Sequence, residues 1–357
     1  MPIRSRFSIP VPLSSIPTQV FGSADGPLPE KLAFADCEAP EILRLTLHDY
    51  REWSKRLAAG LIQAGLQDGD RVLLHSGNSI FTPVVAMGVI MAGGIVSMAN
   101  PMFVPKELAH QVRDSGARFL LTATDLMECA NEAASLVGLD QDYVYIFDDT
   151  PLAAPNRPLS TSQQKHWSSL LAGPAEGTRF RWEGFSTEDQ ANRTAFLFYS
   201  SGTTGVPKGV EVTHRNIVAN NCQIIHHQRL DPRFRQLDEA GIATTICPLP
   251  MYHGLGLVMC ALVSPGRHVP VYIMKRYDGR KLVQYIDRFK VTELLLVPPI
   301  LRWMAKDPYV RSGGVDLSSV KRVACGAAPL SVAATKEFES LWENGQVNVK
   351  QAWGLSE

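Results

Sequence analysis

The sequence has no excess of charge of either sign, because its 357 residues contain 35 Lys and Arg and 35 Asp and Glu. A nucleic-acid or acidic-membrane partner requires a clustered basic surface, and this balance supports neither. Hydrophobic residues make up 45% and charged residues 20%, which excludes collagen-like, coiled-coil and disordered chains. At about 100–200 residues per domain, the length predicts two or three folded units with a sizeable core.

The cysteines lack any pairing or metal-binding pattern. Six are scattered along the chain, with no CxxC and no Cys/His spacing typical of a metal site. The N-terminal segment MPIRSRFSIPVPLSSIP does not resemble a secretory signal, and its prolines argue against the amphipathic helix of a transit peptide. We therefore expect free thiols, a reducing compartment and a cytoplasmic location.

One stretch lacks charge altogether. No Asp, Glu, Lys or Arg occurs between Arg71 and Lys106, and residues 84–99 are mostly apolar. A membrane span needs about 20 consecutive apolar residues. Pro83 is typical of the first turn of a helix and Gly93-Gly94 of its end, so the helix between them is too short to cross a bilayer. The pattern predicts a strand, a buried helix and a strand within the core, and no transmembrane segment.

Helical and strand periodicities alternate along most of the chain. Residues 47–61 place their apolar side chains on one helical face, with Thr46 and Asp49 as a capping box and Gly65 as a stop. Other predicted helices cover 105–116, 279–289 and 331–342, and predicted strands cover 71–74, 95–98, 119–122, 194–199, 242–247, 294–297 and 320–324. This alternation predicts an α/β fold with a largely parallel sheet between helices. Residues 150–193 are predicted to form a surface connection.

A glycine-rich turn follows the strand predicted over 194–199. The segment YSSGTTGVPKG contains four Ser and Thr hydroxyls, three glycines and Lys208. Glycines let backbone N–H groups approach an anion, hydroxyls add donors, and the lysine supplies a mobile positive charge, so the turn favours polyphosphate binding over a plain surface loop. A Walker A loop is excluded because Pro207 precedes the lysine and Gly209 follows it. No GxGxxG follows the first strand, which disfavours a Rossmann dehydrogenase.

The segment YSSGTTGVPKGV resembles the phosphate loop of the adenylate-forming (AMP-binding) superfamily, which includes acyl– and aryl–CoA ligases, luciferases and the adenylation domains of peptide synthetases. Further segments match in the family's order: GDRVLLHSGNS (69–79), THRNI (213–217), PMYHGLGL (250–257), VPPI (297–300), CGAAPLS (325–331) and QAWGLSE (351–357). The chain is most similar to coumarate–CoA ligase-like enzymes. The resemblance implies two stacked βα subdomains of the ligase large domain, about 70–225 and 15–69 plus 226–357, with the active cleft between them.

The resemblance implies that the hydroxyl-rich loop and its lysine hold the β- and γ-phosphates of ATP while a substrate carboxylate attacks the α-phosphorus. The residues at these positions are Ser200, Ser201, Gly202, Thr203, Thr204, Gly205 and Lys208. Charge develops on the leaving pyrophosphate, so the chemistry requires fixed donors and a cation. Lys208 is accordingly predicted to be catalytic as well as nucleotide-binding.

A second set of predicted site residues lies farther along the chain. The resemblance places His253 where the acyl carboxylate meets the α-phosphate, as a catalytic residue; the alternative is a histidine that satisfies local backbone groups. Gly326, Ala327 and Ala328 are implied to form a platform beside adenine, and small residues also suit a tight strand-end turn. Cys325 is predicted to be a buried small residue and not a nucleophile.

The last seven residues, QAWGLSE, match a family motif written Q-G-Y-G-[ML]-T-E. The resemblance implies that Trp353 stacks on adenine, that Ser356 bonds the α-phosphate and that Glu357 helps to hold Mg²⁺. Ala352 replaces the family's glycine beside the acyl pocket. The nucleotide-binding residues implied here are Gln351, Ala352, Trp353, Gly354 and Ser356.

The implied activity is ATP-dependent conversion of a carboxylic acid to an acyl-adenylate with release of pyrophosphate, followed by thioester formation with coenzyme A. Because the family's small C-terminal domain is absent from the chain, we expect a truncated ligase. A non-catalytic nucleotide- or acyl-binding protein and an adenylation module that loads a carrier protein are the alternatives. A peroxisomal location is the alternative if a C-terminal signal follows Glu357. An aryl or medium-chain acid is favoured by the apolar residues Leu255, Gly256, Leu257 and Ala327.

Overall fold

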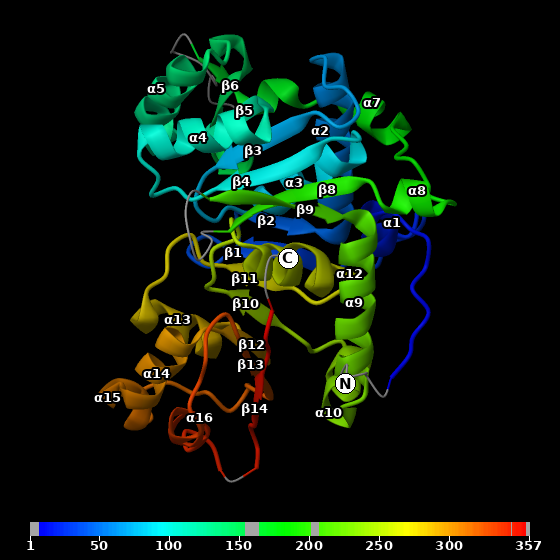
Figure 1. The fold of residues 1–357 in the computed structure, drawn as a ribbon. Helices are drawn as coiled ribbons and strands as arrows, with labels where there is room; N and C mark the ends of the chain where they lie inside the picture. The colour runs from blue at the N-terminus through cyan, green and yellow to red at the C-terminus, as the bar shows by residue number, and fades with distance from the viewer. Residues whose placement is uncertain (1–6, 154–163, 201–206, 344, 355–357) are drawn as a thin grey trace, which may run out of the picture.

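A computed structural model describes residues 7–153, 164–200, 207–343 and 345–354, and its strands form two seven-stranded sheets (Figure 1). The first sheet contains β3 (Arg71–His75), β4 (Ile95–Ala99), β5 (Ala117–Ala123), β6 (Val144–Phe147), β7 (Lys165–His166), β8 (Thr194–Ser200) and β9 (Lys208–Thr213). The second sheet contains β1 (Leu32–Asp36), β2 (Arg44–Thr46), β10 (Thr245–Cys247), β11 (Val271–Ile273), β12 (Glu293–Leu296), β13 (Arg322–Cys325) and β14 (Val349–Gln351).

The two sheets share a strand order. The first runs β7-β6-β5-β3-β4-β8-β9 and the second β14-β13-β12-β10-β11-β1-β2. All neighbouring strands are parallel except the pairs β8–β9 and β1–β2. In each sheet the chain moves one strand to one side, from β3 to β4 or from β10 to β11, and then crosses back. Ligands of such folds bind beyond the carboxyl ends of the strands where the order reverses, here β3/β5 and β10/β12.

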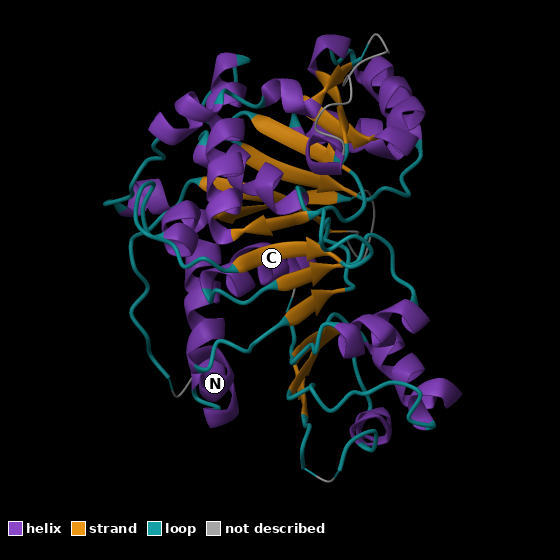
Figure 2. Ribbon diagram, turned by 180° about the vertical axis from the view of Figure 1, so that it is seen from behind, coloured by secondary structure: helices purple, strands orange, loops and turns teal. Residues whose placement is uncertain are grey.

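Helices cover the faces of both sheets (Figure 2). The longer ones are α1 (Ile16–Phe21), α2 (Leu47–Gln63), α3 (Thr82–Met91), α4 (Pro105–Ser115), α5 (Met127–Val137), α7 (Pro174–Arg179), α9 (His214–Arg229), α10 (Pro232–Glu239), α13 (Gly279–Arg288), α14 (Pro298–Lys306) and α16 (Val332–Glu339). Single turns are α6 (Thr150–Ala153), α8 (Glu188–Ala191), α11 (Gly254–Leu257), α12 (Ser264–Gly266), α15 (Pro308–Arg311), η1 (Thr124–Leu126), η2 (Gln141–Tyr143) and η3 (Trp167–Leu170), and η4 (Val258–Val263) is a π-helix. The predicted α/β class is confirmed.

Local signals account for the best-predicted helices. The capping box at the start of α2 is present: Asp49 N–H donates to Thr46 Oγ1 at 3.0 Å, and Thr46 N–H donates to Asp49 Oδ2 at 2.9 Å. Every residue of α3 is buried, which explains the absence of charge around it. Gly93 then takes φ +82°, a conformation that favours glycine and ends the helix. None of the described helices combines the length and the apolar character that crossing a membrane requires.

The core divides according to the faces of the sheets. Alternate residues of a strand point to opposite faces, so Val72 and Leu74 of β3 join one cluster and Leu73 joins another with α4 and α5. The first cluster also contains α2, α3 and the β11 residues Val271 and Ile273, so both sheets share it. The other face of the second sheet packs against α13, α14 and α16. The two sheets are thus joined through one apolar core.

The prediction that residues 150–193 form a surface connection is wrong in part. Trp167 is fully buried, with its ring centroid 4.9 Å from that of Phe81 and 5.5 Å from that of Phe147. Its indole N–H donates to the Asp148 carbonyl at 2.9 Å, and Lys165–His166 adds the edge strand β7. The sequence did not indicate this burial, because a single buried tryptophan in a Pro- and Ser-rich segment produces no periodic pattern of apolar residues.

Candidate functional site

The predicted phosphate ligands lie at the end of a hairpin formed by β8 and β9. Ser200 is the last residue of β8 and pairs with Lys208, the first residue of β9. Lys208 is exposed, Ser200 is half-buried, and β9 is the edge strand of the first sheet. The lysine therefore belongs to a strand. The other predicted loop residues, Ser201, Gly202, Thr203, Thr204 and Gly205, lie outside the described residues.

His253 lies beyond the carboxyl end of β10, in the turn that leads into α11, where it is the residue before the first helical turn. A Cβ added to Gly256 would lie 2.3 Å from the Pro250 carbonyl oxygen, so this tight turn requires glycine. The ring of His253 is exposed, and partial desolvation by its neighbours lowers its pKa. The imidazole is therefore neutral at pH 7 and able to donate one hydrogen bond and accept another.

The turn that carries His253 contacts the strand that carries Ser200. A Cβ at Gly254 would lie 3.4 Å from the ring of Phe198, two residues before Ser200 in β8. The hairpin that carries the predicted phosphate ligands thus meets, at the switch point β10/β12, the turn of the other sheet that carries His253.

The predicted adenine platform and the C-terminal motif are brought together at β13 and β14. Ala352 N–H donates to the Cys325 carbonyl at 2.8 Å, and a Cβ at Gly326 would lie 3.2 Å from the Ala352 carbonyl oxygen. Ala327 has φ +70°, a left-handed conformation that is strained for a residue with a side chain and marks a sharp turn. Ala327, Ala328, Gln351, Ala352, Trp353 and Gly354 are all exposed.

Three further predictions concern residues near this edge. Cys325 is buried, and burial raises the pKa of its thiol, so it is a poor nucleophile at neutral pH. Leu257 packs in the core shared by the sheets. Ser356 and Glu357 lie outside the described residues. Within the described part of the chain, no three His, Cys, Asp or Glu side chains are grouped as metal ligands.

Sequence reasoning missed Asn78, which joins the two sheets beside the His253 turn. Its Nδ2 donates to the carbonyls of Leu249 at 2.9 Å and Met274 at 3.0 Å, and its Oδ1 accepts from Met251 N–H at 2.8 Å. One side chain in the loop after β3 therefore fixes the loops after β10 and β11. The available signal was a lone amide three residues after a buried strand, which is typical of a side chain that satisfies backbone groups.

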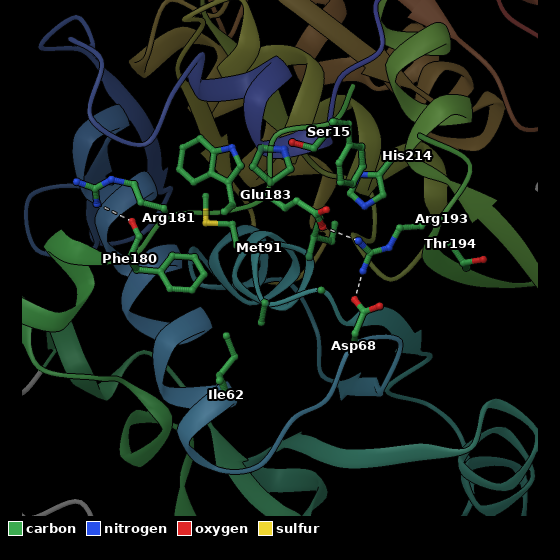
Figure 3. Close-up of a pocket in the computed structure, with 16 residues that line it drawn as sticks. Ser15, Ile62, Asp68, Met91, Phe180, Arg181, Glu183, Arg193, Thr194 and His214 are labelled. Atoms are coloured by element: carbon green, nitrogen blue, oxygen red, sulfur yellow. Dashed lines mark hydrogen bonds and ion pairs between the residues drawn. The ribbon is translucent and has the colours of Figure 1, made fainter. Parts of the chain in front are cut away.

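The described residues also enclose a cavity of about 230 Å³ at the opposite edge of the first sheet, between the amino ends of β4 and β8 (Figure 3). Its charged groups are already paired, since Arg193 contacts both Asp68 and Glu183. His214 Nδ1 accepts the Ile16 N–H at 3.1 Å. None of the predicted site residues lines it, and Ser200 lies at the far end of β8, so this cavity is separate from the candidate site.

Comparison with known proteins gives one consistent assignment. The family model described as AMP-binding enzyme matches residues 24–357. An acyl-CoA ligase, azaF, from Aspergillus niger is 29% identical over 98% of this chain and 62% of its own length. The peroxisomal OPC-8:0-CoA ligase 1 of Arabidopsis thaliana is 31% identical over 92% of this chain and 55% of its own length. The chain spans between 55% and 62% of the length of three curated relatives that it matches.

Solved structures share the fold. A luciferase-like enzyme from the mealworm Zophobas morio superimposes with a TM-score of 0.78 at 18% identity, over 98% of this chain and 74% of the other. A long-chain-fatty-acid-CoA ligase from Archaeoglobus fulgidus gives a TM-score of 0.77 at 23% identity, over 98% and 66%. The match of the family model to almost the whole chain, on a fold shared with these proteins, shows that the chain belongs to the AMP-binding enzyme family.

Proposed function

We propose that the protein activates a carboxylic acid with ATP and transfers the acyl group to coenzyme A. In the first step a carboxylate oxygen attacks the α-phosphorus, the bond from that phosphorus to the bridging oxygen breaks, and pyrophosphate leaves. In the second step the thiol of coenzyme A attacks the acyl carbon, loses its proton, and AMP leaves with the bonding pair. The names of the relatives, acyl-CoA ligases in Aspergillus niger and Arabidopsis thaliana, support this reaction class.

The observation that carries the proposal is the contact between the β8–β9 hairpin and the His253 turn. Polyphosphate chemistry requires a cation and hydroxyl donors on one side of the α-phosphorus and a donor for the carboxylate on the other. Lys208 and Ser200 supply the first set, and the neutral imidazole of His253 supplies the second. We propose that the active cleft lies here, between subdomains covering about 70–225 and 15–69 plus 226–357.

We assign the remaining roles on the same basis. The loop residues Ser201, Gly202, Thr203, Thr204 and Gly205 would surround the β- and γ-phosphates. Gly326, Ala327, Ala328, Gln351, Trp353 and Gly354 would hold the adenosine end, and Ser356 would bond the α-phosphate. Trp353 is free to stack because its side chain is 87% exposed. Ala352 would border the acyl pocket and narrow it by one methyl group, which suits an aryl or medium-chain acid.

Magnesium suits this donor set. It binds proteins through one or two carboxylates together with substrate phosphates, so Glu357 and the nucleotide would hold it without a closed protein cage. Bound there, it would neutralise charge on the phosphates. We place the protein in the cytoplasm, since its six cysteines are free thiols. The peroxisome is the alternative, because one relative is named as a peroxisomal ligase.

The experiment that tests the proposal is acid-dependent exchange of labelled pyrophosphate into ATP. It is run with Mg²⁺ on the chain itself and on a version extended with the C-terminal region of a relative, over a panel of aryl, medium-chain and long-chain acids. Exchange that requires both an acid and His253 supports the proposal. ATP binding without exchange in either version would favour a non-catalytic nucleotide-binding protein instead, and exchange without thioester formation would favour transfer to a carrier protein.

A further inference from the structure

Helix α4 contacts both strands of the hairpin that carries the predicted phosphate ligands. His110 Nε2 donates to the Pro207 carbonyl at 3.2 Å, and the Tyr199 hydroxyl donates to Asp114 Oδ2 at 2.6 Å. His110 and Asp114 are four residues apart, so they lie on one face of the helix. Pro207 immediately precedes Lys208, and Tyr199 immediately precedes Ser200. One helical face therefore contacts the residue next to each predicted ligand.

The helix itself is fixed to the sheet independently of the hairpin. Gln111 is 1% exposed, and its Nε2 donates to Ser97 Oγ at 3.0 Å and to the Met98 carbonyl at 3.1 Å, both in β4. At the C-terminal end, Arg71 Nε donates to the Ser115 carbonyl at 2.7 Å. Hydrogen bonds hold α4 to β3 and β4. The contacts of α4 with the hairpin therefore hold the contacted residues in a defined position.

The tyrosine reaches the helix because β9 has a glycine opposite it. Tyr199 pairs with Gly209, and a Cβ at Gly209 would lie 3.1 Å from the tyrosine ring. The ring therefore lies across the edge strand, with its hydroxyl at the last turn of α4. Burial, and next the Asp114 carboxylate, raise the pKa of Tyr199, so the phenol keeps its proton and remains the donor.

An edge strand that begins after a glycine-rich segment needs such support. Among the described strands β9 has one neighbour, β8, and its first residue is Lys208. Glycine-rich chain loses much conformational entropy when it is ordered. Side-chain contacts to both strands restrict the hairpin end before any ligand arrives, and preorganised donors bind a ligand at lower entropic cost.

We propose that His110 and Asp114 are positioning residues, which hold Ser200 and Lys208 in place for the terminal phosphates of a nucleoside triphosphate. This inference rests on the proposed function, because it takes the hairpin end as the polyphosphate site. Neither residue contacts the nucleotide in this account. Their removal therefore weakens binding of the polyphosphate and leaves binding of the nucleoside monophosphate unchanged.

The test is calorimetric titration of the purified chain with ATP and with AMP, in the presence of Mg²⁺. His110→Ala and Asp114→Ala each lose one hydrogen bond to the hairpin, so each should weaken ATP binding by about threefold to tenfold and AMP binding by less than about twofold. Tyr199→Phe removes the same bond from the other side and should match Asp114→Ala. Asp114→Asn keeps an oxygen acceptor and should restore most of the ATP affinity. Lys106→Ala, on an exposed residue of the same helix, is the matched control.

The outcomes separate this inference from the proposed function. If Lys208→Ala weakens ATP selectively but the helix variants leave the ATP-to-AMP affinity ratio unchanged, the positioning role is overturned alone. If Lys208→Ala also leaves that ratio unchanged, the proposed function falls together with it. A loss of both affinities in step with the melting temperature, with no rescue by Asp114→Asn, would show that α4 supports only folding and would also overturn the positioning role.

Discussion

The carboxyl edges of the two sheets have the same strand order and different chemistry. At the β3/β5 edge of the first sheet, the polar side chains are paired with one another. His75 is fully buried, with its Nδ1 3.1 Å from Thr122 Oγ1. Asp149 accepts from the Ser79 hydroxyl at 2.6 Å and pairs with Lys275 Nζ at 2.6 Å. These contacts stabilise the junction between the sheets, and the burial of His75, Ser79 and Asp149 keeps them from a ligand in solvent.

At the carboxyl edge of the second sheet, from β10 to β14, and on the hairpin that meets it, the polar and aromatic side chains are exposed. His253, Lys208 and Trp353 all face solvent, and within the described part of the chain none of the three makes an ion pair. Strand order alone therefore identifies two crevices. The state of the side chains decides between them: paired groups hold the fold together, and unpaired groups remain available to bind.

The largest expected effect contrasts two tryptophans, one at each edge. Trp167→Ala should lower the free energy of unfolding by about 3–5 kcal/mol, because it removes a fully buried aromatic ring. Trp353→Ala should change it by less than about 0.5 kcal/mol, because that side chain is 87% exposed, while weakening binding of both ATP and AMP. Urea unfolding measures the first quantity and calorimetry the second. Similar losses of stability in the two variants would contradict the difference between a packed edge and an exposed one.

The next effect is a pH dependence at the packed edge. Burial lowers the pKa of His75 from 6.5 to about 4. Below about pH 6.5 the unfolded chain therefore binds a proton at this histidine that the folded chain does not bind. The contribution of His75 to the free energy of unfolding is fully present above this pH and is lost as the pH decreases toward 4, by up to about 3 kcal/mol. Urea unfolding between pH 4.5 and 7.5 measures this slope, which His75→Leu should reduce.

Burial also lowers the pKa of His214 to about 4. His214 therefore adds to the same decrease in the free energy of unfolding as the pH falls. The exposed residue His48 provides the control for a histidine-to-leucine substitution outside the packed edge. A wild-type slope retained in His75→Leu would contradict a buried, neutral imidazole at β3/β5.

A smaller effect concerns the amide that connects the edges. Asn78→Ala removes three hydrogen bonds to backbone groups and should lower stability by about 1–3 kcal/mol. Because Met251 is two residues before His253, acid-dependent pyrophosphate exchange should fall more than ATP affinity does. Asn78→Asp keeps the acceptor, loses both donors and sets a negative charge beside two carbonyls, so it should be no better than alanine. A fully active Asn78→Asp protein would show that the bridge is dispensable.

Elements with strong local signals were predictable from the sequence. The capping box of α2, the glycine-bounded α3 and the strands β3, β4 and β8 lie within a few residues of their predictions. The strand predicted over 242–247 begins only at Thr245, because Gly241 forms a left-handed turn and Ile242 is 58% exposed. Local patterns fix the type of an element better than they fix its ends.

Features that depend on distant residues were not predictable. β9 was missed because it begins inside a glycine-rich motif, and its short alternation Val-Glu-Val-Thr forms a strand only by pairing with β8. The parallel pairing of β1 with β11 was also not predictable, because the paired residues Phe34 and Val271 are far apart in the chain. The interactions of Asn78, His110 and Asp114 follow from how loops and helices meet in space. The motifs predicted the residue types of the candidate site. They did not predict the side chains that hold those residues in place.

The most direct test of the central claim, that the β8–β9 hairpin end binds polyphosphate, is the affinity of Lys208→Ala for ATP and for AMP. Removing a cation that contacts charged oxygens costs about 1.5–3 kcal/mol, so ATP affinity should fall by about tenfold to a hundredfold. AMP lacks the phosphates concerned, and its affinity should not change. Calorimetry on the wild type, Lys208→Ala and the control Lys106→Ala gives both values. Equal losses for the two nucleotides, or none for either, would contradict the account.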